Sequence, residues 1–267
     1  MDSNQKKKIK ALNREFVALQ RQESRLTRSA LRAKPAGWKT ALEQKVPEKV
    51  YTGLNTAFCK GFSLVFQHGR KLIELTYKKD TLHQKHSMQD DAFRQQGQRK
   101  NIRMLQKNAR GSNNLNVAVT TLEGIGLGAL GIGMPDIVLF LTTVLRGIYE
   151  TALHYGFGYQ SRFEQMLILK MMAASLSTGA EWFSRNREIN DWLRLDDRKV
   201  TEEEFEAQIK VTSEVFAVDM LLLKFIQGLP VVGILGGTAN PLYYNRIIRY
   251  VQLKYRRRYL LKLQKEI

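Results

Sequence analysis

Residues 47–72, PEKVYTGLNTAFCKGFSLVFQHGRKL, decide the fold class. Their apolar side chains recur at spacings of three, four and seven, the period of a helix with one buried face: Val50, Leu54, Phe58, Phe62, Val65 and Leu72. Pro47 suits the first helical turn, where its missing N–H is no loss. Gly53, Ala57 and Gly61 form a stripe of small residues that either lets a second helix approach closely or reflects ordinary packing in a soluble bundle.

The same helical period continues along most of the chain, and two capping patterns support it. Ser161 with Glu164 and Thr201 with Glu204 have the Ser/Thr-x-x-Glu spacing that begins helices. The sequence therefore predicts an all-α protein, a helical bundle with negligible strand.

Two apolar stretches interrupt the pattern. Residues 124–145 hold one charge, Asp136, and residues 225–245 hold none. Both contain several glycines and are broken by proline, so we expect hairpin-like segments, with Asp136 capping the helix after the first. Such segments either dip into a lipid interface or form a tight soluble core. A charge inside the bilayer costs about 2.5–3.5 kcal/mol, so Asp136 disfavours full spanning.

No cofactor or metal is expected. Residues 126–131, GLGALG, match G-x-G-x-x-G, but Pro135 breaks the required helix and no βαβ units follow. No lysine follows the glycines, so a P-loop is absent. His83 and His86, with Asp90 as a third candidate ligand, form the kind of surface pair that arises by chance. A single cysteine, Cys59, excludes a disulfide framework and a multi-cysteine zinc site.

The polar segment at residues 80–114 indicates a long exposed helix or hairpin that ends near Gly111. Its candidate anchors are apolar: Phe93, Ile102, Met104 and Leu105. We expect this segment to be an insertion in a helical domain of residues 38–260. A basic extension at residues 1–37 precedes the domain, and a short tail at residues 261–267 follows it.

The charge is high and unevenly placed. The 267 residues carry 43 Lys and Arg against 25 Asp and Glu, a net charge of +18. Basic residues dominate positions 1–110 and 246–267, whereas acidic residues outnumber them at positions 111–245. This layout favours an anionic partner surface, either lipid or nucleic acid, over a merely solvated surface. The basic N-terminal segment lacks the apolar run of a secretory signal, so we expect the chain to stay on the cytoplasmic side.

The C-terminal helix is predicted to be amphipathic, with a tyrosine-rich face opposite a basic one. Such a helix either seals a bundle or lies on an anionic surface. The candidate anionic-surface contacts are Arg246, Arg249, Lys254, Arg256, Arg257 and Arg258.

A series of short motifs, in order, resembles the EcsC family. The motifs are Trp38, VPEKV at 46–50, Glu123-Gly124, Pro135-Asp136, Arg146, ALHYG at 152–156, LPVVG at 229–233, Asn240, Tyr255 and Arg258. The resemblance spans about residues 38–260. It implies an all-α, cytoplasmic, bacterial protein associated with membranes or transport, and it transfers no catalytic residue.

The residues around the most distinctive segment are the candidate functional ones: Glu123, Asp136, Arg146, His154 and Tyr155. Asp136 and His154 share a helix face but lie about 27 Å apart on one helix, so they form no dyad. Arg146 and Glu150 are four residues apart and are expected to pair with each other. No nucleophile with a flanking base is visible, which favours a non-enzymatic role without deciding it.

Three functions follow from these observations. The leading hypothesis is a non-enzymatic accessory protein of the EcsC type, peripheral to the inner face of the cell membrane and linked to an ABC transporter or to secretion. Its partner is then an anionic membrane surface or a membrane protein. The first alternative is a nucleic-acid-binding basic protein, in which the C-terminal tyrosines and arginines contact bases and phosphates. The second is a hydrolase-like enzyme, whose small-molecule substrate is unknown.

Overall fold

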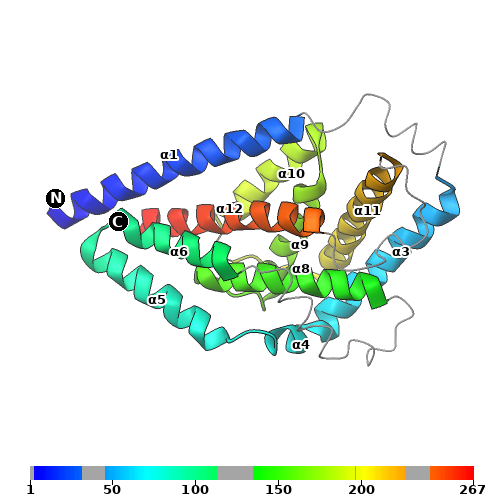
Figure 1. Ribbon diagram of the computed structural model, residues 1–267, viewed down its shortest axis with the longest axis horizontal. Helices are drawn as coiled ribbons and strands as arrows, with labels where there is room; N and C mark the ends of the chain where they lie inside the picture. The colour runs from blue at the N-terminus through cyan, green and yellow to red at the C-terminus, as the bar shows by residue number, and fades with distance from the viewer. Residues whose placement is uncertain (1–2, 32–45, 113–134, 196, 227–240) are drawn as a thin grey trace.

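The structure is a computed structural model that describes residues 3–31, 46–112, 135–195, 197–226 and 241–267. These residues form helices and no strand, so the all-α prediction is confirmed for them (Figure 1). The glycine-rich runs, with Glu123 and the GLGALG motif, lie outside the described residues, as does most of the second apolar stretch.

The described helices follow the predicted periods. In chain order they are α1 (Ser3–Leu31), α3 (Glu48–Leu64), the π-helical turn η1 (Val65–Gly69), α4 (Arg70–Glu74), α5 (Lys79–Gln96), α6 (Arg99–Ser112), α8 (Pro135–His154), α9 (Arg162–Leu176), α10 (Gly179–Trp192), α11 (Glu202–Ile226) and α12 (Pro241–Glu266). The segment quoted first thus forms a nearly continuous helix from Glu48 to Glu74, with Pro47 at its N-cap and a π turn inside it.

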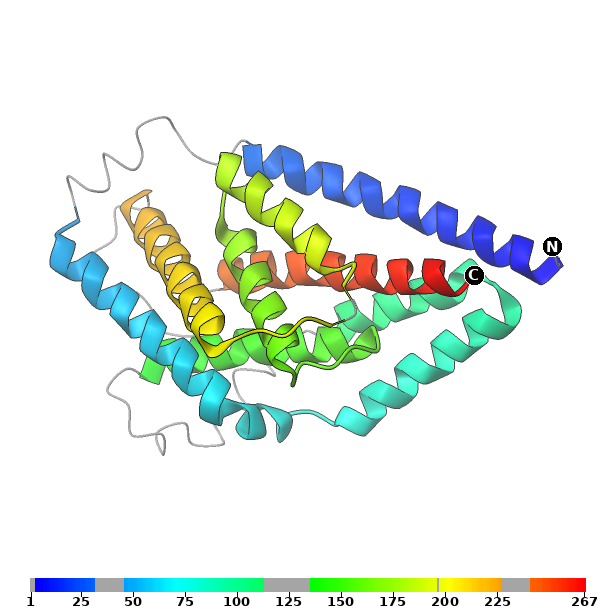
Figure 2. The ribbon, with the colours of Figure 1, turned by 180° about the vertical axis from the view of Figure 1, so that it is seen from behind.

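The last helix of the chain, α12, runs through the centre of the molecule (Figures 1 and 2). It packs against α1, α6, α8 and α9, and it lies antiparallel to α1. Its tyrosines are buried, each no more than 5% exposed: Tyr243, Tyr244, Tyr250, Tyr255 and Tyr259. The helix is therefore enclosed over most of its length, and of the two alternatives it seals the bundle.

The same hydrophobic core extends to where α3 lies along α11. Phe58 and Phe62 each stand 5.4 Å from Phe216 of α11, measured between ring centroids, and all three are fully buried. Gly61 lets α8 approach, because a Cβ at that position would stand 3.0 Å from Ile137. At this glycine the small-residue stripe serves ordinary packing inside the bundle.

The polar segment forms a helical hairpin of α5 and α6, which confirms that part of the prediction. The turn is made by Gly97, whose φ of 64° lies in the left-handed region that glycine adopts without strain. Phe93, Ile102 and Leu105 are buried as expected, whereas Met104 is 41% exposed. The hairpin packs on α8 and α1, so it belongs to the bundle and is not an exposed arm.

The two capping patterns differ in the structure. The Thr201 hydroxyl accepts from the Glu204 backbone N–H, and the Glu204 carboxylate accepts from the Thr201 N–H in return. The Ser161 hydroxyl also accepts from the Glu164 N–H at 3.2 Å. The Glu164 carboxylate, however, turns inward to Arg258 on α12, so this pattern forms only half of a capping box.

The helix α8 begins at Pro135, which confirms a helix start beside Asp136, although the Asp136 side chain lies outside the described residues. Residues Ile137–His154 are long and apolar enough to cross a membrane, but 94% of this window is buried inside the bundle. A core helix has the same composition when it is covered on all sides. The burial of α8 thus accounts for its hydropathy.

The close contact between α8 and α12 at Gly147 yields a stability prediction. A Cβ on Gly147 would stand 2.6 Å from the Tyr244 hydroxyl and 2.9 Å from Ile248, both on α12. We expect Gly147→Ala to lower the free energy of unfolding by about 1–3 kcal/mol through overpacking. The matched control is Gly53→Ala, which meets no atom within 4 Å and should gain up to about 1 kcal/mol of helix propensity. Urea denaturation followed by circular dichroism measures both, and equal gains would contradict the close packing.

Candidate functional site

The predicted residues of α8 serve the packing of that helix. Arg146 forms a buried ion pair with Glu150 at 3.0 Å, and its Nε donates to the Thr76 hydroxyl at 2.8 Å. Burial raises the pKa of Glu150 to about 7, against the opposing effect of Arg146. The expected Arg146–Glu150 pair is thus present, and it ties α8 to the turn after α4.

His154 ends α8 and lies in the interface with α5. Its backbone carbonyl accepts from Nδ1 of His86 at 3.1 Å, and the imidazole of His86 packs edge-on against Tyr259. Burial, with smaller contributions from the neighbouring Lys85 and His86, lowers the pKa of His154 to about 4. His154 is therefore neutral at pH 7, and the structure places it at the opposite end of α8 from Asp136.

His86 also fills the space beside the left-handed Gly156, where a Cβ would stand 2.2 Å from its Nε2. Its role is thus packing. Among the described residues no group of three His, Cys, Asp or Glu side chains could hold a metal ion. The candidate residues of α8 do not converge on one reactive centre, since Arg146 and His154 each bind separate partners.

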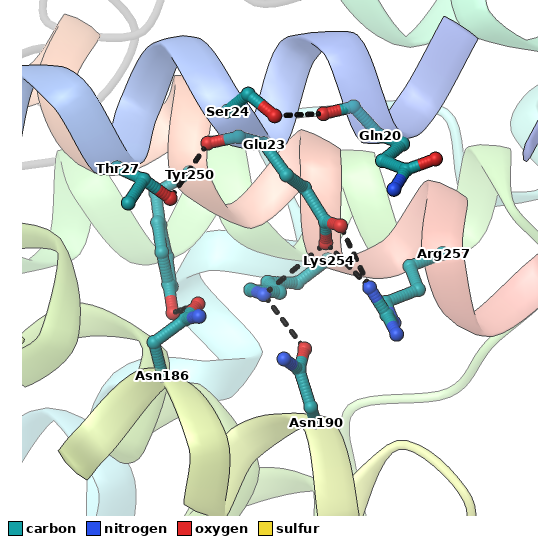
Figure 3. A network of polar contacts seen from close by, with 9 residues as sticks. All are labelled: Gln20, Glu23, Ser24, Thr27, Asn186, Asn190, Tyr250, Lys254 and Arg257. Carbon is teal, nitrogen blue, oxygen red and sulfur yellow. Dashed lines mark hydrogen bonds and ion pairs between the residues drawn. The ribbon is translucent and has the colours of Figure 1, made fainter. Parts of the chain in front are cut away.

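The basic residues of α12 meet carboxylates from helices distant in sequence. Glu23 of α1 accepts from Arg257 at 2.7 Å and lies 3.5 Å from the Lys254 ammonium, which also donates to Asn190 of α10 at 2.8 Å (Figure 3). Tyr250 donates to Asn186 at 2.8 Å in the same network. These contacts join α1, α10 and α12. Burial lowers the pKa of Lys254 to about 8.

A second carboxylate of α1 lies deeper. Glu15 is 1% exposed, and it accepts from Arg256 of α12 and from Arg99 of α6, each at 2.5 Å. Arg258 turns to the other side of α12, where it binds Glu164 of α9 at 2.6 Å and stacks over Phe157. We call the set Glu15, Glu23, Glu164, Lys254, Arg256, Arg257 and Arg258 the charged seam.

The seam corrects the predicted anionic-surface contacts. Lys254, Arg256 and Arg258 are 1%, 2% and 7% exposed and are paired, so they contact no external surface. Arg257 pairs with Glu23, and Arg246 pairs with Asp219 of α11 at 3.1 Å. Only Arg249 of the six is well exposed and appears in no ion pair among the described residues. Sequence reasoning missed Glu15 and Glu23, which no local spacing links to a helix more than 200 residues away.

A cavity of about 520 Å³ opens between α1, α6 and α12. It is lined by Gln22, Arg25, Leu26, Gln106, Arg110, Tyr155, Arg249, Gln252, Leu253 and Arg256. Tyr155 is therefore brought beside basic residues of three helices, whereas His154, its neighbour in sequence, is not. The lining holds four arginines and no carboxylate.

The outer surface around this cavity is basic. The described residues of α1 include two carboxylates, Glu15 and Glu23, and both turn inward to the charged seam. The helix α6 has no acidic residue at all. Exposed cations cover the two helices: Lys6, Lys7, Lys10, Arg14, Arg21, Arg25 and Arg28 of α1, with Lys100, Arg103, Lys107 and Arg110 of α6. We call these side chains the α1–α6 basic face.

The charged seam predicts unequal effects of removing two carboxylates. Glu15→Ala would leave Arg256 buried without its anion, which costs about 3–5 kcal/mol of unfolding free energy. The matched control is Glu202→Ala, because Glu202 is 56% exposed in its pair with Arg162 and should lose at most about 1 kcal/mol. Chemical denaturation measures both. Equal losses would show that the seam does not depend on a buried pair.

A pH dependence follows from His154. Folding lowers its pKa from 6.5 to about 4, so between these values the unfolded chain binds the proton more readily. The free energy of unfolding should therefore fall as the pH drops from 6.5 to 4. In His154→Gln this loss should be smaller over the same window. Melting temperatures of both proteins measured across the window provide the test, and parallel curves would exclude the contribution of His154.

Comparison with known proteins identifies a family. The model of the EcsC protein family matches residues 10–260, which include most of α1 and both sides of the charged seam. No curated protein and no solved structure matches the chain. Because the family match covers almost the whole chain, the chain belongs to the EcsC protein family.

Proposed function

We propose that this EcsC protein is a non-enzymatic accessory protein that binds the anionic inner face of the cell membrane through the α1–α6 basic face. The observation that carries the proposal is the orientation of charge on α1. Its carboxylates face α12, whereas its exposed side is basic and adjoins α6, which has no acidic residue. A surface of one sign attracts anionic lipids with about 1 kcal/mol per cation near the membrane.

Exposed apolar side chains on the same two helices favour lipid over nucleic acid. Val17 of α1 is 49% exposed and Met104 of α6 is 41% exposed, both among cations. Apolar side chains beside basic ones are typical of interfacial helices. The tyrosines that the nucleic-acid hypothesis needs for base stacking are buried along α12, so that hypothesis loses its main support.

The family membership adds an expectation about context. The resemblance implies an accessory role beside an ABC transporter or in secretion, and a peripheral protein on the cytoplasmic side is suited to that role. The scattered packing roles of Arg146 and His154 support a non-enzymatic function over hydrolysis.

Vesicle binding tests the proposal. In Lys100→Gln/Arg103→Gln/Lys107→Gln, three exposed cations of α6 are removed. At about 1 kcal/mol each, binding to phosphatidylglycerol vesicles at low salt should weaken by about a hundredfold. The difference should shrink at high salt, because screening already removes the attraction.

The matched control removes three exposed lysines of α3, α4 and α11: Lys60→Gln/Lys71→Gln/Lys210→Gln. The vesicle binding of this control should change far less, although the control has the same net charge as the α6 variant. Equal losses in both variants would reject the α1–α6 basic face as the contact. Retention of the native protein on DNA but not on vesicles at equal salt would favour nucleic acid instead.

A further inference from the structure

The cavity between α1, α6 and α12 has the composition of an anion site. Its volume of about 520 Å³ is in the range of small-molecule sites. Its charged and amide groups are all able to donate hydrogen bonds: Arg25, Arg110, Arg249, Arg256, Gln22, Gln106 and Gln252. No aspartate or glutamate is among the lining residues, so nothing in the lining repels an anion.

The inner wall of the cavity is held in place before any ligand arrives. Arg256 is 2% exposed, and its guanidinium donates to Glu15 at 2.5 Å and to Gln22 at 2.8 Å. Its Nε–H is buried and has no acceptor among the residues that the structure describes. A buried donor without an acceptor is costly, so the protein's own groups leave this guanidinium incompletely satisfied.

Gln106 links this inner wall to the rim. In the amide orientation that satisfies both of its ends, its oxygen accepts from Arg110 at 2.9 Å and from Arg256 at 3.3 Å. The amide thereby holds the guanidinium of the exposed Arg110 close to the buried one. Fixed guanidinium groups suit the oxygens of a phosphate, because each can donate two parallel hydrogen bonds.

The charge balance indicates a ligand with more than one negative charge. Glu15 is shared by Arg256 and Arg99, so one negative charge faces two positive charges at the inner wall. Arg25, Arg110 and Arg249 form no ion pair with any described carboxylate, and all three are exposed. Three uncompensated cations on separate helices repel one another until an anion joins them.

We propose that this cavity binds the phosphomonoester group of an organic ligand. A phosphomonoester carries about −1.5 to −2 charges at pH 7, which matches the three cations better than a singly charged phosphodiester. The side chains of Leu26, Leu253 and Tyr155 give the cavity an apolar part, which accommodates the carbon portion of the ligand. Burial raises the pKa of Tyr155, so its hydroxyl keeps its proton.

This inference deepens the proposed function, on which it rests for the lipid source of the group. A phosphomonoester reaches the cavity either as the headgroup of phosphatidic acid or as a soluble compound. The cavity opens within the α1–α6 basic face, since Arg25 and Arg110 belong to both. A headgroup at the membrane surface is therefore within reach of the cavity when that face contacts lipid.

The test uses glycerol 3-phosphate in solution and two kinds of vesicle. The native protein should bind glycerol 3-phosphate at one saturable site by isothermal titration calorimetry. Arg110→Gln/Arg249→Gln, at two exposed positions, should weaken this binding at least tenfold. The control Lys60→Gln/Lys71→Gln has the same charge change outside both the cavity and the α1–α6 basic face, and it should weaken the binding less than twofold. Melting temperatures of both variants verify that they are folded.

The vesicle experiment distinguishes a lipid headgroup from a soluble compound as the source of the phosphomonoester. Vesicles of phosphatidic acid and of phosphatidylglycerol are compared at matched surface charge. A preference for phosphatidic acid that disappears in Arg110→Gln/Arg249→Gln identifies the lipid headgroup. Saturable binding of glycerol 3-phosphate without that preference supports the cavity and identifies a soluble phosphomonoester.

Two results would overturn the inference. One is that the native protein neither binds glycerol 3-phosphate saturably nor prefers phosphatidic acid. The other is an equal loss in the cavity variant and its control, which would mean general electrostatic attraction. Neither result contradicts the proposed function, provided that the triple variant of α6 binds phosphatidylglycerol vesicles more weakly than the native protein. If only the membrane-binding proposal is wrong, the native protein should still bind glycerol 3-phosphate in the calorimeter.

Discussion

The buried contact of Glu15 with Arg256 is the constraint on which the arrangement of the helices depends. Moving an ion out of water costs several kcal/mol, so neither side chain is tolerated in the core without the other. Glu15 must therefore lie against α12 at this position, and Glu23, eight residues along the same face, then reaches Lys254 and Arg257. Arg99 on the same carboxylate adds α6 to the contact. One carboxylate thus aligns three helices.

The same constraint determines the character of the outer surface. The chain has a net charge of +18, so its carboxylates are outnumbered by cations. Both described carboxylates of α1 point inward. The exposed side of α1 and the neighbouring α6 are then basic without compensation. The same distribution of charge therefore produces both the buried ion pairs and the basic outer surface. The cavity lies between them, because it is lined by the paired Arg256 and by the exposed Arg25 and Arg110.

Much of the fold was predictable from the sequence, because it rests on local patterns. The apolar period of residues 47–72 predicts the helix that the structure forms from α3 to α4. The predicted end of the polar segment near Gly111 agrees with the end of α6 at Ser112. The helix start beside Asp136 follows from Pro135. Each of these depends on residues within a few turns of one another, where spacing alone decides the structure.

The candidate site was predicted less well for a geometric reason. Arg256, Arg257 and Arg258 are consecutive in sequence, but successive residues of a helix point 100° apart. Two of the three reach different carboxylates of α1 and the third reaches Glu164 of α9, so a basic cluster in the sequence is dispersed in the structure. Their partners lie up to 241 positions away, a separation that no local pattern reports. The candidate residue Tyr155 lies in the lining of the cavity, but the sequence did not indicate which arginines surround it.

The pairing of the first helix with the last affects how the chain folds during synthesis. Glu15 is synthesised more than 200 residues before Arg256, and among the described helices the central α12 is made last. Contacts between such distant segments carry the entropy cost of closing a very long loop, and they form late. Until then α1 exposes both its apolar stripe and its unpaired carboxylates. The described bundle is therefore completed only after α12 has been synthesised, and a nascent chain that stalls before α12 lacks the element around which the other helices pack.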